Sequence, residues 1–204
     1  HQSDQHLSEH NLGYLYKTMI EAKSSAKYIY ETSKTYKSKQ EYPNNAFGKQ
    51  LKTTAEFINS NIQSKVYYVS MGGFDTHANQ ADRQKRLLST YSESMEVFVN
   101  ELKQNDTFKD TLILTFSEFG RRVHQNAAGG TDHGAANNVF IIGENLKSKG
   151  FYNELPDLAN LDANGDIIHT VDFRSVYATI LEKWLQVDDA VILNKSFSKL
   201  DFIN

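Results

Sequence analysis

Apolar residues recur at intervals of three and four in several stretches of the chain, and this spacing predicts helices. It predicts one helix over about 9–36, a shorter one over about 51–58 and a long one over 80–104. Asp172, a residue type that favours the first capping position of a helix, precedes a fourth helical pattern that ends near Leu185. Helices therefore occupy both ends and the middle of the chain.

Three short runs of β-prone apolar residues lack helical spacing and predict buried strands at 66–71, 111–116 and 138–142. The first two runs flank the long helix, and strand–helix–strand units are almost always right-handed and parallel. The third run follows without a crossover helix, which favours an antiparallel neighbour. We therefore expect an α/β fold with a mixed, mainly parallel sheet flanked by helices.

Polar side chains lie next to all three predicted strands. Asp75 and His77 follow the first strand, Glu118 follows the second, and Asp132 and His133 precede the third. Open α/β sheets bind ligands at the carboxyl edge of their parallel strands. An antiparallel third strand would begin at that same edge, so we expect all five side chains to meet there.

These residue types suit a divalent metal ion. In an extended segment, Asp75 and His77 project from one face because they are two positions apart. A carboxylate with two imidazoles and an open position is a catalytic zinc arrangement, and adding Glu118 would also suit manganese or iron. Zinc or manganese is the expected cofactor. Arg121 and Arg122 can hold an anionic substrate through their forked donors.

Each candidate also has a purely structural interpretation, which the sequence leaves open. Asp75 can cap the turn after the strand, and His77 can be a hydrogen-bonded loop histidine. Glu118 can pair with Arg121 at the surface, and residues 131–134 can form only a turn. The joint convergence at one edge is the argument for a metal site.

Composition narrows the function classes. The 204 residues are 39% hydrophobic and 23% charged, which is an ordinary globular balance. A net charge of −3 predicts no nucleic-acid partner, and the lack of cysteine excludes disulfides and thiolate metal sites. The apolar runs are too short to cross a bilayer. Residues 1–48 are expected to form a helical arm and loop, and 49–204 the α/β domain.

Four ordered motifs resemble the bacterial DUF1501 family, and the resemblance extends from about Tyr42 to the end of the chain. The motifs are Gly72-Gly73-Phe74-Asp75-Thr76-His77, Ser117-Glu118-Phe119-Gly120-Arg121, Gly130-Thr131-Asp132-His133-Gly134, and Asp172-Phe173-Arg174 with Trp184-Leu185. By similarity this family belongs to the alkaline phosphatase superfamily, which includes sulfatases and phosphomutases. The resemblance therefore implies an alkaline-phosphatase-like sheet with a metal site at its carboxyl edge.

Superfamily enzymes use two metal ions, Asp and His ligands, and a Ser or Thr nucleophile. Asp75 and His77 resemble one ligand pair, Glu118 stands where the superfamily has an Asp, and His133 resembles the last His ligand. Two departures put the second ion in doubt. The spacing from Asp75 to His77 is shorter than in the phosphatases, and Phe119 stands where a second His is expected.

The resemblance implies an exported, periplasmic protein, because family members typically use the twin-arginine route. We expect a metal-dependent hydrolase of phosphate or sulfate esters. The alternative is a pseudo-enzyme that binds an anionic glycan or an envelope partner with the same pocket. No nucleophile is recognisable, and no strand precedes Val66 to carry one, so we expect the chain to be the C-terminal part of a longer protein.

Overall fold

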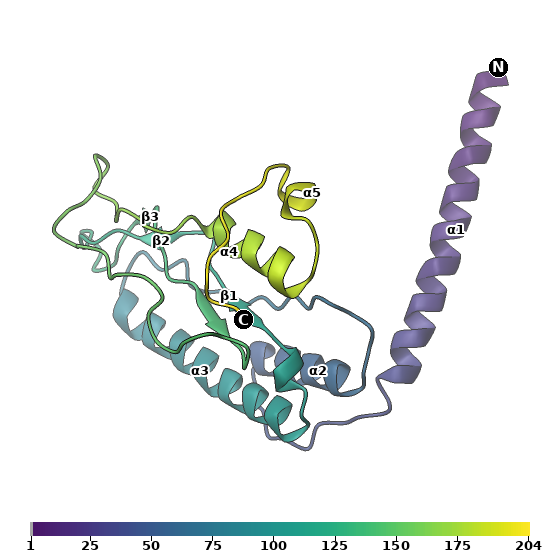
Figure 1. Cartoon of the computed structure of the whole chain (residues 1–204), viewed down its shortest axis with the longest axis horizontal. Coiled ribbons are helices and arrows are strands. Elements are labelled where there is room, and N and C mark those ends of the chain that lie inside the picture. Colours follow the sequence, from purple (N-terminus) through teal and green to yellow (C-terminus); the bar gives the residue numbers. More distant parts are fainter. Residues whose placement is uncertain (1) are drawn as a thin grey trace.

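The computed structural model describes the backbone from Gln2 to Asn204 and the side chains from Leu12 onward (Figure 1), so the first residue of the predicted arm lies outside it. The helices and strands in chain order are α1 (Gln2–Thr32), α2 (Ala46–Asn59), α3 (Gln80–Gln104), the short 3-10 helix η1 (Phe108–Asp110), β1 (Ile113–Thr115), β2 (Gly120–Arg121), β3 (His133–Gly134), β4 (Phe140–Ile142), α4 (Phe173–Thr179), the π-helical turn η2 (Ile180–Trp184) and α5 (Asp189–Leu193).

The strands form two small antiparallel sheets. β1 pairs with β4, with Leu114 opposite Ile141, and β2 pairs with β3. No parallel pair occurs within residues 2–204. Helices hold 41% of the residues and strands 7%, so the predicted mainly parallel, alkaline-phosphatase-like α/β sheet is wrong for this structure. The predicted antiparallel pairing of the run at 138–142 is correct, because β4 in this run pairs with β1 in the run at 111–116.

The predicted parallel sheet is absent from the described part of the chain because its expected first strand, 66–71, is not a strand in the structure. This segment forms no ladder with any described strand. Val69 and Met71 pack against the core, whereas Val66 and Tyr68 are 70% and 79% exposed. A β-prone run becomes a strand only when a second backbone pairs with it, and local sequence does not supply that partner.

The main core lies between α2 and α3, which pack against each other. Its buried side chains are Phe47, Leu51, Ala55, Met95, Phe98, Leu102 and Phe108. Ile113 of β1 packs against this core, whereas Leu114 packs against a second cluster formed by Val176, Phe202 and Ile203. Because successive side chains of a strand point to opposite faces, the β1–β4 pair lies between the α2–α3 layer and α4 (Figure 1).

Helix α1 ends at Thr32, four residues before the predicted end, and extends away from the other elements (Figure 1). Its apolar side chains are exposed, including Leu12 at 66% and Met19 at 62%. The predicted apolar face of this helix is therefore not buried against the rest of the described chain. From Gln2 onward, no helix combines the length and apolarity needed to cross a membrane.

Candidate metal centre

Two loops form the site. Loop 72–79 leads from the extended segment 66–71 into α3, and loop 129–134 ends in β3. The pairing of β3 with β2 places His133 opposite Arg121. The second loop is therefore fixed by a ladder, and the first by the start of a long helix.

Glycines allow these backbones to approach closely. A Cβ on Gly120 would lie 1.6 Å from the carbonyl oxygen of Ala136. A Cβ on Gly130 would lie 2.4 Å from the carbonyl oxygen of His77. Side chains larger than hydrogen are excluded at both positions, so the Gly-rich motifs bring the site loops into direct backbone contact.

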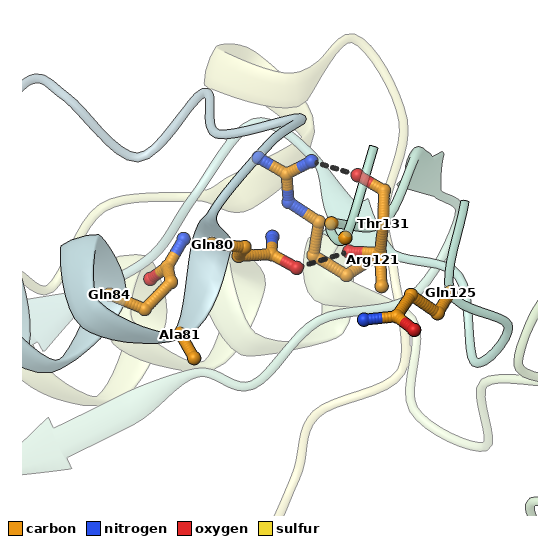
Figure 2. Close-up of a pocket in the computed structure, with 8 residues that line it drawn as sticks. Gln80, Ala81, Gln84, Arg121, Gln125 and Thr131 are labelled. Carbon is orange, nitrogen blue, oxygen red and sulfur yellow. Dashed lines mark hydrogen bonds between the residues drawn. The ribbon is translucent and has the colours of Figure 1, made fainter. Parts of the chain in front are cut away.

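Thr76 anchors loop 72–79 on α3 and is fully buried. Its hydroxyl accepts hydrogen bonds from Gln84 Nε2 at 2.9 Å and from Gln80 Nε2 at 3.1 Å. The same Gln80 accepts a hydrogen bond from the Thr131 hydroxyl at 3.0 Å, as Figure 2 shows. Side chains at the beginning of α3 thereby tie the two loops together.

Asp75, His77 and His133 converge in front of these loops. Asp75 Oδ1 lies 2.9 Å from His77 Nε2 and 2.8 Å from His133 Nε2. One ligand atom from each residue lies within 4.8 Å of the other two. The two imidazole centroids are 4.9 Å apart, and all three side chains face solvent. Of the five side chains that the sequence predicted to meet, these three form one group, whereas Glu118 and Asp132 are not part of it.

His77 has two carboxylate neighbours, and this arrangement is compatible with a bound cation. Its Nε2 faces Asp75 at 2.9 Å, and its Nδ1 faces Asp132 Oδ1 at 3.4 Å. A neutral imidazole has one N–H, so it can donate to only one of two carboxylates. In the other contact a nitrogen lone pair faces a carboxylate, and a cation bound by both groups would make that contact favourable. Ligands bound to zinc at about 2.1 Å are about 3.4 Å apart, so a modest opening of the cluster would accommodate the ion.

Hydrogen bonds favour the charged form of both carboxylates. The bond from His133 is the largest cause that holds the pKa of Asp75 below its ordinary value, and the bond from His77 adds to it. The pKa of Asp132 is lowered first by the Asn126 amide and then by His77. Both groups are therefore anionic at neutral pH, as metal binding or histidine orientation requires.

Phe119 has a role that the sequence did not indicate. Its ring stacks on His133 with centroids 3.9 Å apart and planes at 4°. The guanidinium of Arg121 lies over the same ring at 5.1 Å. The residue that stands where the resemblance expects a second His ligand instead fixes the plane of His133.

Asp132 and Asn126 both contact His77, Asp132 through the imidazole Nδ1 and Asn126 through the backbone carbonyl. The Asn126 amide nitrogen donates to Asp132 Oδ1 at 3.2 Å and to the carbonyl oxygen of His77 at 3.0 Å. Asp132 is outside the group of mutually close ligand atoms that Asp75 forms with the two imidazoles. Composition around Asn126, with Gly129 and Gly130, indicates a turn but not this contact, so sequence reasoning missed the residue.

Glu118 lies in the bend between β1 and β2 and is exposed. It is not in the group formed by Asp75, His77 and His133. Its predicted role as a metal ligand stays a prediction. The group of close ligand-type atoms in the described residues thus comes from two loops, and the loop that carries Glu118 does not contribute to it.

The two arginines differ in their partners. Arg121 donates to the carbonyl oxygens of Thr131 and Phe74, each at 2.6 Å, and no carboxylate of the described chain lies within 4.0 Å of it. It lines a pocket of about 470 Å³, shown in Figure 2, together with Gln80, Ala81, Gln84, Gln125, Gly129, Gly130 and Thr131. Arg122 instead lies 3.4 Å from the buried Asp166. The charge of Arg121 is therefore the one left open to an anion.

A second acidic group, Glu182, Asp188 and Asp189, has a structural explanation. The Lys199 ammonium lies 2.9 Å from Glu182 and 3.0 Å from Asp189. Asp188 caps α5 by accepting a hydrogen bond from the Ala190 N–H at 2.9 Å. Each of the three carboxylates therefore has a partner within the chain that accounts for its position without a metal ion.

Comparisons with known proteins place the chain in a family without assigning an activity. The sequence model of a family described as "Protein of unknown function (DUF1501)" matches residues 14–195. No curated protein and no solved structure matches the chain. The match spans both loops of the candidate metal centre and most of the helices around it. The chain therefore belongs to the DUF1501 family.

Proposed function

We propose that Asp75, His77 and His133 bind one divalent cation, zinc or manganese. The observation that supports this proposal best is the convergence of three ligand atoms from two separate loops within 4.8 Å. Two imidazoles and a carboxylate leave at least one coordination position open, which is typical of catalytic and not of structural zinc sites.

We further propose that the site hydrolyses phosphate or sulfate esters. When bound, a divalent cation supplies Lewis-acid polarisation of an ester oxygen. Arg121 supports the choice of an anionic substrate, because its guanidinium has no carboxylate partner among the described side chains. It lines a pocket that borders loop 129–134, although Asp75, His77 and His133 do not line that pocket. The resemblance to the alkaline phosphatase superfamily supports the same substrate class and, by itself, an exported location.

A second candidate is a pseudo-enzyme that binds an anionic glycan or an envelope partner. Two observations favour it. Phe119 packs flat on His133 at a position where superfamily enzymes have a ligand, and Glu118 stays outside the ligand group. The described residues thus offer one ion's ligands, whereas the superfamily reaction uses two ions.

The test combines metal content with turnover. Purified protein, reloaded with zinc or manganese chloride, is analysed for bound metal and assayed with p-nitrophenyl phosphate and p-nitrophenyl sulfate. His133→Ala should lose both metal and turnover, whereas His124→Ala, an exposed histidine outside the group, should lose neither. Metal without turnover supports the binding protein, and absence of metal in every variant overturns the site.

A further inference from the structure

The second partner of His77 points to a further role at the proposed cation site. Asp132 Oδ1 lies 3.4 Å from Nδ1 of His77, on the side of the ring opposite to Nε2 and Asp75. We infer that Asp132, held by Asn126, is a positioning residue that accepts the Nδ1–H of His77 when Nε2 binds the cation and so holds the ring in that orientation. The inference rests on the cation site proposed above.

Asn126 makes the position of Asp132 specific. Its Oδ1 accepts hydrogen bonds from the backbone N–H groups of Ala128 and Gly130, both at 3.0 Å. These donors fix which end of the amide is oxygen, so the nitrogen must face the acceptors on the other side. Those acceptors are Asp132 Oδ1 and the carbonyl oxygen of His77. One side chain therefore fixes the carboxylate and the histidine backbone relative to each other.

Two carboxylates compete for the single proton of a neutral His77. If Nε2 carries it, the N–H donates to Asp75 at 2.9 Å and that nitrogen cannot bind a cation. If Nδ1 carries it, the N–H faces Asp132 and Nε2 presents a lone pair beside Asp75. Metal-binding histidines commonly donate their second N–H to a carboxylate, and removing such a partner typically weakens metal binding about 10–100-fold.

The same geometry argues against Asp132 as a direct ligand. Its oxygen faces Nδ1, whereas the nitrogens that converge on Asp75 are both Nε2. Asp132 also lies outside the group whose ligand atoms are mutually within 4.8 Å. A cation at Asp75 would therefore have His77 between itself and Asp132.

The experiment measures zinc affinity and the tautomer of His77 in Asp132→Ala, Asp132→Asn and a control, Asp82→Ala, which removes an exposed carboxylate in the first turn of α3, outside the ligand group. Zinc affinity is measured by competition with a chelating indicator, and the protonated nitrogen is identified by ¹⁵N NMR of the metal-free imidazoles. Asp132→Ala should weaken zinc binding about 10–100-fold. It should also raise the fraction of metal-free His77 that carries its proton on Nε2, because the acceptor for the Nδ1–H group is gone. Asp132→Asn, which keeps an acceptor oxygen, should lie between Asp132→Ala and wild type, and Asp82→Ala should match wild type.

Three results would overturn the inference. Loss of zinc binding in Asp132→Ala as complete as in His77→Ala would make Asp132 a ligand. An unchanged tautomer together with unchanged affinity would leave Asp132 without influence on the ring. An equal effect of Asp82→Ala on zinc affinity would mean that Asp132 acts only through the general negative charge of the surface. A wild-type protein that binds neither zinc nor manganese overturns the cation site itself, and the NMR measurement then decides separately whether Asp132 orients His77.

Discussion

Replacing Gly130 with alanine tests how closely the two site loops must approach. The new Cβ would lie 2.4 Å from the carbonyl oxygen of His77 and 3.0 Å from the backbone nitrogen of Ala78. Ordinary contact begins at 3.4 Å, so the loops must separate by 3.4 − 2.4 = 1.0 Å. Metal ligands must be held to within about 0.5 Å of their productive positions. The separation therefore exceeds what the site tolerates.

The free-energy cost of Gly130→Ala can be estimated from the packing around this position. Forcing an extra methyl group into a well-packed position typically costs about 1–3 kcal/mol. Since 1.4 kcal/mol is a factor of ten in a dissociation constant, Gly130→Ala should weaken zinc binding by about 5- to 150-fold if loop displacement relieves the strain. Strain that stays in the folded protein should instead lower the free energy of unfolding by the same amount.

The assay measures both quantities in the same preparations, zinc affinity by indicator competition and unfolding by urea. Gly72→Ala, in the other site loop, is the matched control, because its Cβ would meet nothing within 4 Å. The control should keep wild-type affinity and stability. If Gly130→Ala also keeps both, the backbone contact between the loops does not position the ligands and the reasoning is refuted.

Three further predictions address the core, the site and pH. Leu102→Ala, at a fully buried position, should lower the free energy of unfolding by about 2–5 kcal/mol in urea denaturation, whereas the half-exposed Leu88→Ala should change it little. Phe119→Ala should weaken zinc binding about 2- to 10-fold by removing the stacking partner of His133, and Phe119→Tyr should restore it. Hydrogen bonds, first from a backbone N–H, lower the pKa of Asp189 from 3.8 to about 2. Its stabilisation is therefore fully present above pH 3.8 and lost as pH falls toward 2, so Asp189→Asn should flatten the acid side of the stability curve.

The sequence determined the helices well because their signals are local. The apolar spacing predicted 80–104, and α3 spans Gln80–Gln104. The Asp172 cap was also correct, since its carboxylate accepts a hydrogen bond from the Arg174 N–H at 2.8 Å. Both signals depend on residues no more than four positions apart, so no distant partner is needed to interpret them.

The strands were determined less well because pairing is not local. The run 66–71 has the composition of a buried strand, yet it forms no ladder within the described residues. The shorter run in β1 does form one, because β4 lies beside it. Composition shows that a segment can be a strand, and only the position of a second backbone decides whether it is one.

The sequence predicted that five side chains meet at a parallel sheet edge. Three of them, Asp75, His77 and His133, form one group, and the described residues contain no such edge. Tertiary structure brings them together by other means, the β2–β3 pair and close backbone contact at Gly130. The residue types were readable because cation chemistry requires carboxylates and imidazoles.

The supporting roles were decided only by tertiary structure. Phe119 stacks on His133, and Asn126 holds Asp132 against the far side of His77. A phenylalanine or an asparagine in a loop has many possible partners, and the sequence does not rank them. Their functions depend on ring stacking and hydrogen-bond geometry, which exist only after segments distant along the chain have been packed to within a few ångströms.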